Sequence, residues 1–197
     1  GMSERQVAAE IVCSHLRKGA EEMSFEPIVA SGPNGALPHA RPGDRILREG
    51  DVVVLDFGCV SGGYASDMTR TIAVGQPSER VVEAYETVLG AQEAALEHAR
   101  SGMMAKDLDR LAREHIEERG LGEYFTHSLG HGVGLQVHEW PRISALSDYT
   151  LPDRAVVSIE PGVYITDEFG VRIEDLVVLH PDGCENLTRA PKELIVV

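Results

Sequence analysis

Cysteine is scarce in this chain of 197 residues. The three that occur, Cys13, Cys59 and Cys184, lie far apart, are odd in number and form no C-x-x-C pair. A disulfide framework or a thiolate zinc site needs paired or closely spaced cysteines, so the sequence argues against both. We expect the three thiols to be buried.

Long apolar runs are also missing. No stretch approaches the roughly 18 apolar residues of a membrane helix, and the start, "GMSERQVAAE", is charged and lacks the apolar core of a signal peptide. We therefore expect no membrane partner and a cytoplasmic location. The chain has 43% hydrophobic and 25% charged residues, which is an ordinary globular composition, and its length predicts one domain over residues 1–197.

Basic residues are outnumbered, with 18 Lys and Arg against 32 Asp and Glu, giving a net charge of −14. Nucleic-acid binding relies on basic patches, so we expect no nucleic-acid partner. The excess of acidic residues has two interpretations: it makes the protein soluble, or several of the carboxylates lie together around cations. Composition alone leaves both interpretations open.

Hydrophobic periodicity predicts helices and hairpins in one chain. Ser3 and Gln6 form a capping box before a helix that Gly19 ends. Further helices are predicted from Ser78 to about Arg100 and over about 104–119, with a short strand at 27–31 and hairpins over 51–74 and about 155–179. This mixture predicts an α+β fold.

The two hairpins are similar to each other. "LREGDVVVLDFG" (47–58) aligns with "LPDRAVVSIEPG" (151–162) at an offset of 104, and the offset becomes 107 after the turns. Asp56 then aligns with Glu160, and Asp67 with Glu174. A duplicated unit that closes a shared core explains this match; two generic hairpins are the alternative.

The register of each hairpin predicts which acids face one another. A first turn centred between residues 61 and 62 places Asp56 directly opposite Asp67, and a second turn centred on Asp167 places Glu160 opposite Glu174. Cross-strand partners have Cβ atoms about 5 Å apart, which suits cations about 3.5–4 Å from each other. Four convergent carboxylates repel one another unless they are protonated or hold divalent metal, and we favour metal.

A histidine-containing segment, "SLGHGVGLQVHEWP", supplies nitrogen ligands for such a site. His131 stands between glycines, where the backbone can approach a ligand closely, and His138 follows seven residues later. We expect the other histidines singled out here to be structural or solvated: His15, His98, His115, His127 and His180.

Four motifs together resemble a known family. "LDFGCVSGGYASDMTRTIAVG", "GHGVGLQVHEWP", "SIEPGVY" and "GVRIEDLVVL", in this order, resemble the pita-bread metallopeptidases, which include methionine aminopeptidases, aminopeptidase P and prolidases. The match extends from about residue 25 to the end of the chain. It implies an α+β pita-bread fold with two pseudo-symmetric halves, an antiparallel sheet and covering helices.

The resemblance also implies a centre of two divalent metal ions. By this resemblance, Asp56 would chelate one metal. Asp67 and Glu174 would bridge the two metals, and His131 and Glu160 would hold the other. Oxygen-rich ligation with one imidazole suits manganese or cobalt, with zinc or iron as alternatives.

Catalytic roles follow from the same resemblance. A water activated between the metals would be the nucleophile, and Glu160 would carry its proton to the leaving amine. His138 and His39 resemble the pair that binds substrate and stabilises the tetrahedral intermediate. Arg172 in "GVRIED" either orients a site carboxylate or lies on the surface opposite Glu168 or Asp175. We expect Trp140 in the core.

The loops "SGPNGALPHA" and "DMTRTIAVG" resemble the Xaa-Pro-cleaving branch of the family. The predicted function is therefore metal-dependent hydrolysis of the bond between an N-terminal residue and a following proline in a peptide substrate. A methionine aminopeptidase and a catalytically impaired pita-bread module that binds peptides are the alternatives. A function like that of the metal-free creatine-hydrolysing relatives is disfavoured, because the full set of acids would have no role without metal.

The sequence departs from the family at its beginning. We expect a catalytic domain without the usual N-terminal domain and without its own first helix, because "GMSERQ" aligns with "GMMAKD" at an offset of 101 and the helix over 78–100 has no first-half partner. The chain is either naturally short or a fragment. An uncovered apolar face usually finds a partner or causes aggregation, so we expect a homodimer or reduced stability.

Overall fold

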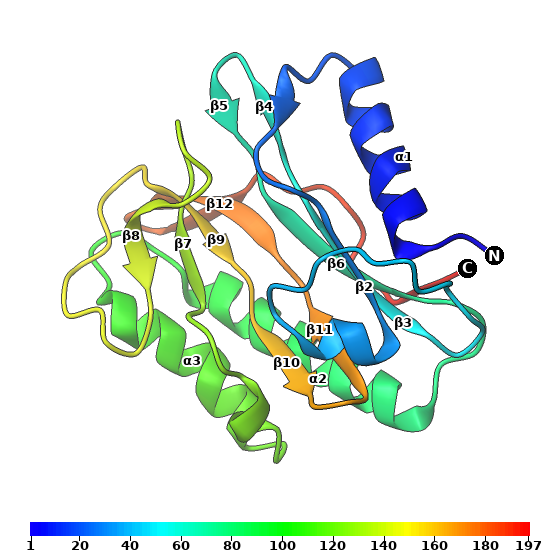
Figure 1. Cartoon of the computed structure of the whole chain (residues 1–197). Coiled ribbons are helices and arrows are strands. Elements are labelled where there is room, and N and C mark those ends of the chain that lie inside the picture. Colours follow the sequence, from blue (N-terminus) through cyan, green and yellow to red (C-terminus); the bar gives the residue numbers. More distant parts are fainter.

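The computed structural model describes residues 1–197 as two main sheets that lie side by side, with two smaller sheets that extend their hairpins and with helices against them (Figure 1). The helices are α1 (Glu4–Arg17), α2 (Glu79–His98) and α3 (Ala105–Glu117), with short 3₁₀ turns η1 (Gly32–Ala36) and η2 (Gly122–Tyr124). The predicted capping box begins α1, because Ser3 Oγ accepts from Gln6 N at 3.2 Å and Gln6 Oε1 accepts from Ser3 N at 2.9 Å. The three predicted helices are confirmed.

The first sheet contains four strands in the order β14-β6-β3-β2. These are β2 (Ile28–Ser31), β3 (Val52–Phe57), β6 (Met68–Ala73) and β14 (Ile195–Val196). Only β14 runs parallel to its neighbour, so the C-terminal end of the chain forms one edge of this sheet. A small sheet of β1 (Glu22–Met23), β4 (Cys59–Ser61) and β5 (Tyr64–Ala65) extends the first hairpin beyond it.

The second sheet contains five strands in the order β13-β12-β9-β7-β8. These are β7 (Gly130–Gly132), β8 (Glu139–Ile143), β9 (Val156–Ile159), β12 (Asp175–His180) and β13 (Gly183–Asn186), and the pair β10 (Gly162–Ile165) and β11 (Phe169–Arg172) extends the second hairpin. A cluster of 25 buried side chains joins this sheet to α2 and α3, among them Val88, Leu108, Val157 and Val177. Burial of these side chains is the main force that holds the helices on the sheet.

The predicted internal repeat is confirmed. Strands β3 and β9 begin 104 residues apart, β6 and β12 match end to end at an offset of 107, and α1 and α3 begin 101 residues apart. Even the isolated bridges correspond, since Ser3 pairs with Ile46 and Met104 with Thr150. Within this chain, α2 has no counterpart in the first half.

The registers of the two hairpins differ from each other. Asp56 pairs with Thr69, so the predicted pairing of Asp56 with Asp67 is wrong. The first turn is centred between Gly62 and Gly63, whose φ angles of +59° and +79° suit a two-residue hairpin turn. The second turn is centred on Asp167 as predicted, and its register continues on both sides of Glu160 and Glu174.

Several side chains predicted to be buried are exposed. Cys13 is exposed, while Cys59 and Cys184 are half-buried, and all three are free thiols. Trp140 is 62% exposed, with its ring beside that of Tyr149, so its predicted place in the core is also wrong. Both residue types are usually buried, but here the segments that carry them lie at the surface.

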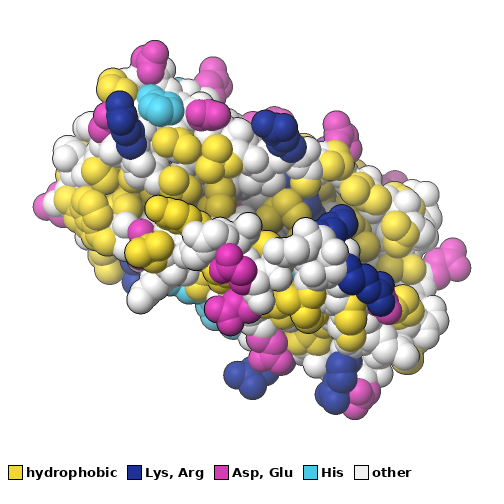
Figure 2. All heavy atoms as spheres, turned by 90° about the horizontal axis from the view of Figure 1, so that it is seen from above, with side chains coloured by type: hydrophobic (Ala, Val, Ile, Leu, Met, Phe, Trp, Pro, Cys, Tyr) yellow, Lys and Arg dark blue, Asp and Glu magenta, His cyan; other side chains and the backbone are white.

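Apolar side chains also gather at the surface. Figure 2 shows hydrophobic side chains spread over much of the face seen from above, and Leu146, Leu135 and Tyr64 are among the exposed large hydrophobic residues. Such surface often contacts another molecule, and homodimerisation stays a prediction. No helix combines the length and the apolar character needed to cross a bilayer.

Candidate metal centre

Five predicted ligands line one cavity of about 470 Å³. They come from both halves of the molecule: Asp56 in β3, Asp67 between β5 and β6, His131 in β7, Glu160 after β9, and Glu174 before β12. The regular strands are interrupted at three of these positions, which lie between β5 and β6, between β9 and β10, and between β11 and β12. The duplicated hairpins therefore bring the acids together at the junction of the halves.

The ligand atoms form overlapping groups. One atom each from Asp56, Asp67 and Glu174 lies within 4.8 Å of the others, and the same holds for His131, Glu160 and Glu174. Glu174 belongs to both groups, and Asp67 also groups with His131 and His138. The arrangement therefore has the form of two neighbouring cation sites with Asp67 and Glu174, the two predicted bridging residues, between them. The predicted convergence of four acids and one histidine is present, and the role of each residue as a ligand stays a prediction.

Three carboxylate oxygens in this cluster are buried without a hydrogen-bond partner: Asp56 Oδ1, Asp67 Oδ1 and Glu174 Oε1. A buried, unpaired carboxylate oxygen is costly because it has lost its water without gaining a donor. Divalent cations would satisfy all three, and a set of four carboxylates with one imidazole is chemically suited to them. The residues present therefore fit the metal ions that the sequence predicts.

Electrostatics within the cavity favour the same conclusion. Burial, with the neighbouring charges of Asp56 and Glu160, raises the pKa of Asp67 to about 8. Burial and the same kind of repulsion also raise the pKa of Asp56 and, strongly, that of Glu174. Burial opposes ionisation of Glu160 too, but its hydrogen bond to His131 lowers its pKa to about 2. Without cations, the other three acids are driven to hold protons.

The stabilisation that metal gives is expected to increase with pH. The raised pKa of Asp67 means that its contribution to the free energy of unfolding is present below about pH 4 and lost as pH rises to about 8. Bound metal displaces the proton of Asp67 and removes the repulsion among the neighbouring carboxylates. Thermal unfolding of EDTA-treated protein should show a larger Tm increase on adding Mn²⁺ at pH 8 than at pH 5.5, and equal increases would contradict the assignment.

Arg172 orients one carboxylate of the cluster. This buried guanidinium donates from Nη2 to Asp56 Oδ2 at 2.5 Å, from Nη1 to Tyr164 Oη at 2.6 Å, and from Nε to Thr69 Oγ1 at 3.0 Å. Of the two interpretations of Arg172, the surface one is wrong. Asp56 Oδ1 is left without a hydrogen-bond partner and is available for a cation.

His127, which lines the cavity, and Tyr164, which bonds to two of the lining residues, were not predicted as part of the site. His127 Nε2 lies 3.0 Å from Tyr164 Oη, whereas the sequence suggested a structural or solvated histidine. Burial lowers the pKa of His127, which favours the neutral ring. Spacing could have indicated both residues, because His127 precedes His131 by four positions and Tyr164 follows Glu160 by four.

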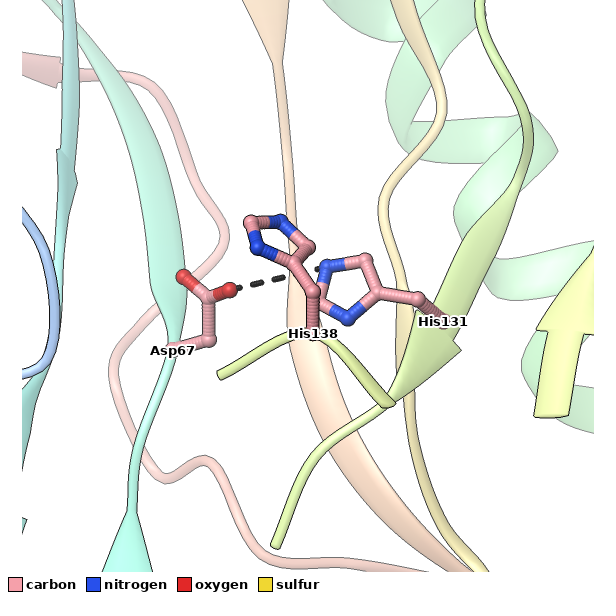
Figure 3. Close-up of side chains that lie close together, drawn as sticks. All are labelled: Asp67, His131 and His138. Carbon is pink, nitrogen blue, oxygen red and sulfur yellow. Dashed lines mark ion pairs between the residues drawn. The ribbon is translucent and has the colours of Figure 1, made fainter. Parts of the chain in front are cut away.

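The two predicted substrate-binding histidines both line the cavity. Figure 3 shows the side chains of Asp67, His131 and His138 converging, with His131 Nε2 at 3.7 Å from Asp67 Oδ2. The ring of His138 lies 4.3 Å from that of His131, and its ligand atom groups with those two residues. His39 lies in the exposed loop after η1.

Glycines on both sides of His131 allow its strand to lie close to its neighbours. A Cβ on Gly130 would lie 1.9 Å from Ser158 O, and one on Gly132 would lie 2.4 Å from Trp140 O. Ser158 Oγ accepts from His131 N at 3.0 Å and donates to Glu160 Oε1 at 3.0 Å. The glycines thus allow His131 to lie beside Glu160. The strand needs them for packing against its neighbours, and not for the close approach of the backbone to a ligand that the sequence suggested.

Comparison with known proteins agrees with this geometry. The model of metallopeptidase family M24 matches residues 1–181. Xaa-Pro dipeptidase of Pyrococcus furiosus is 50% identical over 195 residues, which cover 99% of this chain and 56% of that protein. X-Pro aminopeptidase of Thermotoga maritima has a TM-score of 0.98 at 48% identity, covering 100% of this chain and 56% of that one.

A recombinant prolidase from Thermococcus sibiricus likewise has a TM-score of 0.98 at 49% identity, covering 100% of this chain and 54% of that one. These likenesses confirm the predicted α+β pita-bread fold. The chain spans about half the length of the relatives that it matches.

Proposed function

Because the chain belongs to metallopeptidase family M24, we propose that it is a metal-dependent peptidase domain that hydrolyses the bond between an N-terminal residue and a following proline. The observation that carries this proposal is the buried cluster of acids with three unpartnered carboxylate oxygens in one cavity. The names of the relatives, Xaa-Pro dipeptidase and X-Pro aminopeptidase, support the choice of substrate.

Two groups of residues would hold the cations. Asp56 would hold one and His131 with Glu160 the other. Asp67 and Glu174 would be shared between them. We propose manganese or cobalt, with zinc or iron as alternatives, because oxygen donors predominate. When bound, such ions lower the pKa of water and polarise a carbonyl.

The chain's own residues would handle protons and orientation. Glu160 is ionised and lines the cavity, so it would accept a proton from the attacking water and pass it to the leaving amine. Arg172 holds Asp56 in place. His138 and His39, on the cavity wall, would donate to the oxygen that becomes negative as the carbonyl is attacked.

The test is hydrolysis of Ala-Pro, a Xaa-Pro tripeptide and a Met-Ala peptide with and without Mn²⁺ or Co²⁺. We expect metal-dependent release of the residue before proline, and a loss of at least about a hundredfold in kcat/KM for Asp67→Ala, because one side chain of the cation cluster is removed. Preference for Met-Ala would select a methionine aminopeptidase. Metal binding by calorimetry without any cleavage would select a peptide-binding module.

The compartment also belongs to this proposal. We propose that the protein works in the cytoplasm, since all three cysteines are free thiols and such thiols persist in reducing surroundings.

A further inference from the structure

Arg70 lies on β6 of the first sheet, where this strand contacts β12 of the second sheet. We call this junction of β6 and β12 the seam. Its Nη1 donates to two main-chain oxygens, Thr69 O at 2.9 Å and Glu174 O at 2.6 Å. Glu174 immediately precedes β12 of the second sheet, and β6 and β12 share no regular ladder. A single guanidinium nitrogen therefore bonds to main-chain oxygens of both halves, at the residue whose carboxylate both ligand groups share.

Thr69 completes the hold on Glu174. Its main-chain oxygen accepts from Glu174 N at 3.1 Å, and its Oγ1 donates to Glu174 Oε2 at 2.8 Å. The nitrogen, the main-chain oxygen and one carboxylate oxygen of Glu174 are thus all bonded to Thr69 or Arg70 of the other sheet. Only Oε1 is free, and it is the buried atom without a partner.

Asp175 fixes the orientation of the guanidinium. It is fully buried, and its Oδ1 accepts from Arg70 Nη2 at 2.7 Å. Its Oδ2 accepts from Gln92, Asn186 and Lys192, at 3.0, 2.7 and 2.9 Å. A buried carboxylate with this many donors is held firmly, and breaking one partner of such a pair is costly.

Main-chain oxygens of the C-terminal segment accept the other hydrogen bonds of Arg70. Nε donates to Pro191 O at 2.8 Å, and Nη2 also donates to Ala190 O at 2.9 Å. The same segment continues to β14 at the edge of the first sheet. Arg70 therefore links residues 190–191 to the main chain of Glu174.

We propose that Arg70 is a positioning residue for the metal centre: it sets Glu174 against Asp56 and Asp67 across the seam, with residues 190–191 as its support. The inference rests on the metal centre of the proposed function, although not on its substrate. The ligands come from two sheets that no ladder joins at this point, so their spacing depends on the individual bonds that cross the seam, among them those of Arg70, Thr69 and Arg172. Groups that orient ligands typically change metal affinity about 10–100-fold when removed.

The test is Arg70→Lys, which keeps the charge but loses the planar set of five donors. We expect the Kd for Mn²⁺ and Co²⁺, measured by calorimetry on EDTA-treated protein well below its Tm, to rise at least about tenfold. The visible absorption of bound Co²⁺ should change as well, because the ligand geometry changes.

Arg45→Lys is the matched control. Arg45 donates to both oxygens of Asp51, at 2.6 and 2.7 Å, and to Ser31 Oγ, and these bonds involve none of the candidate ligands. Arg45→Lys should lower Tm and leave the Kd for metal within about twofold of the wild-type value, as expected when the ion pair with Asp51 acts on stability alone. The same pattern in Arg70→Lys would overturn the proposal and leave Arg70 a purely structural residue.

Amide exchange in the wild-type protein gives a test that needs no variant, in case Arg70→Lys does not fold. Metal should slow exchange at Leu187 and Val197, which lie before and after residues 190–191 in the chain and donate to Leu176 O and Ala73 O. Protection confined to the two hairpins would contradict the proposal. A wild-type chain that bound no metal would refute the metal centre itself, whereas metal binding without peptide cleavage would refute only the proposed substrate.

Discussion

Glu160→Gln is expected to lower kcat/KM for an Xaa-Pro peptide by about three orders of magnitude while the fold is kept, as is typical for loss of a group that transfers protons. Glutamine has the same shape and can still accept the hydrogen bond from Ser158 Oγ, now 3.0 Å long. It cannot accept a proton, and it loses the charge that pairs with His131 Nε2 at 3.1 Å. Steady-state kinetics at saturating Mn²⁺, with circular dichroism for the fold, would measure both effects.

The control for this variant is Glu168→Gln. Glu168 forms an exposed ion pair with Arg80 at 2.7 Å, and such pairs contribute about 0–1 kcal/mol, so activity should stay within about twofold. If Glu160→Gln kept more than a tenth of the wild-type kcat at saturating metal, Glu160 would not be the proton carrier. His138 on the same cavity wall would then be the next residue to replace.

The sequence predicted the convergence of the acids in spite of an error in register. The first hairpin pairs Asp56 with Thr69 instead of Asp67, a slip of two residues. Side chains alternate with a period of two, so a slip of two keeps Asp67 on the same face, whereas a slip of one would have turned it away. The repeat identified the right residues because the face of the strand, not the exact partner, decides where a carboxylate points.

The supporting residues could not be predicted in the same way. The bond of Arg70 to Pro191 was not predicted, and the bond of Arg172 to Asp56 was only one of two interpretations that the resemblance suggested; both contacts join segments more than a hundred residues apart. No local periodicity reports such contacts, because they depend on how the two halves are placed together. The exposure of Trp140 and Cys13 was missed for a related reason, since residue type gives only an average burial and says nothing about where a particular segment lies.

Gly170→Ala is expected to destabilise the protein by more than about 3 kcal/mol or to prevent folding, the range of severe overpacking. A Cβ on Gly170 would lie 2.0 Å from Gly35 O, which is main chain and cannot rotate away, and 2.9 Å from Tyr164 Cδ1. Gly35 belongs to η1 of the first half and Gly170 to β11 of the second. Relief of the clash must therefore separate the two halves.

This separation would affect the candidate site as well as stability, because the loop after η1 carries His39 and β11 ends at Arg172, which holds Asp56. Urea unfolding would measure the loss, with Gly43→Ala as the control. A Cβ on Gly43 would have Glu4 Oε2 at 3.5 Å as its nearest neighbour, an ordinary contact, so its effect should stay within about 0.5 kcal/mol. If Gly170→Ala were equally mild, η1 and β11 could not be in the tight main-chain contact described here, and Arg172 would need another explanation for its fixed position.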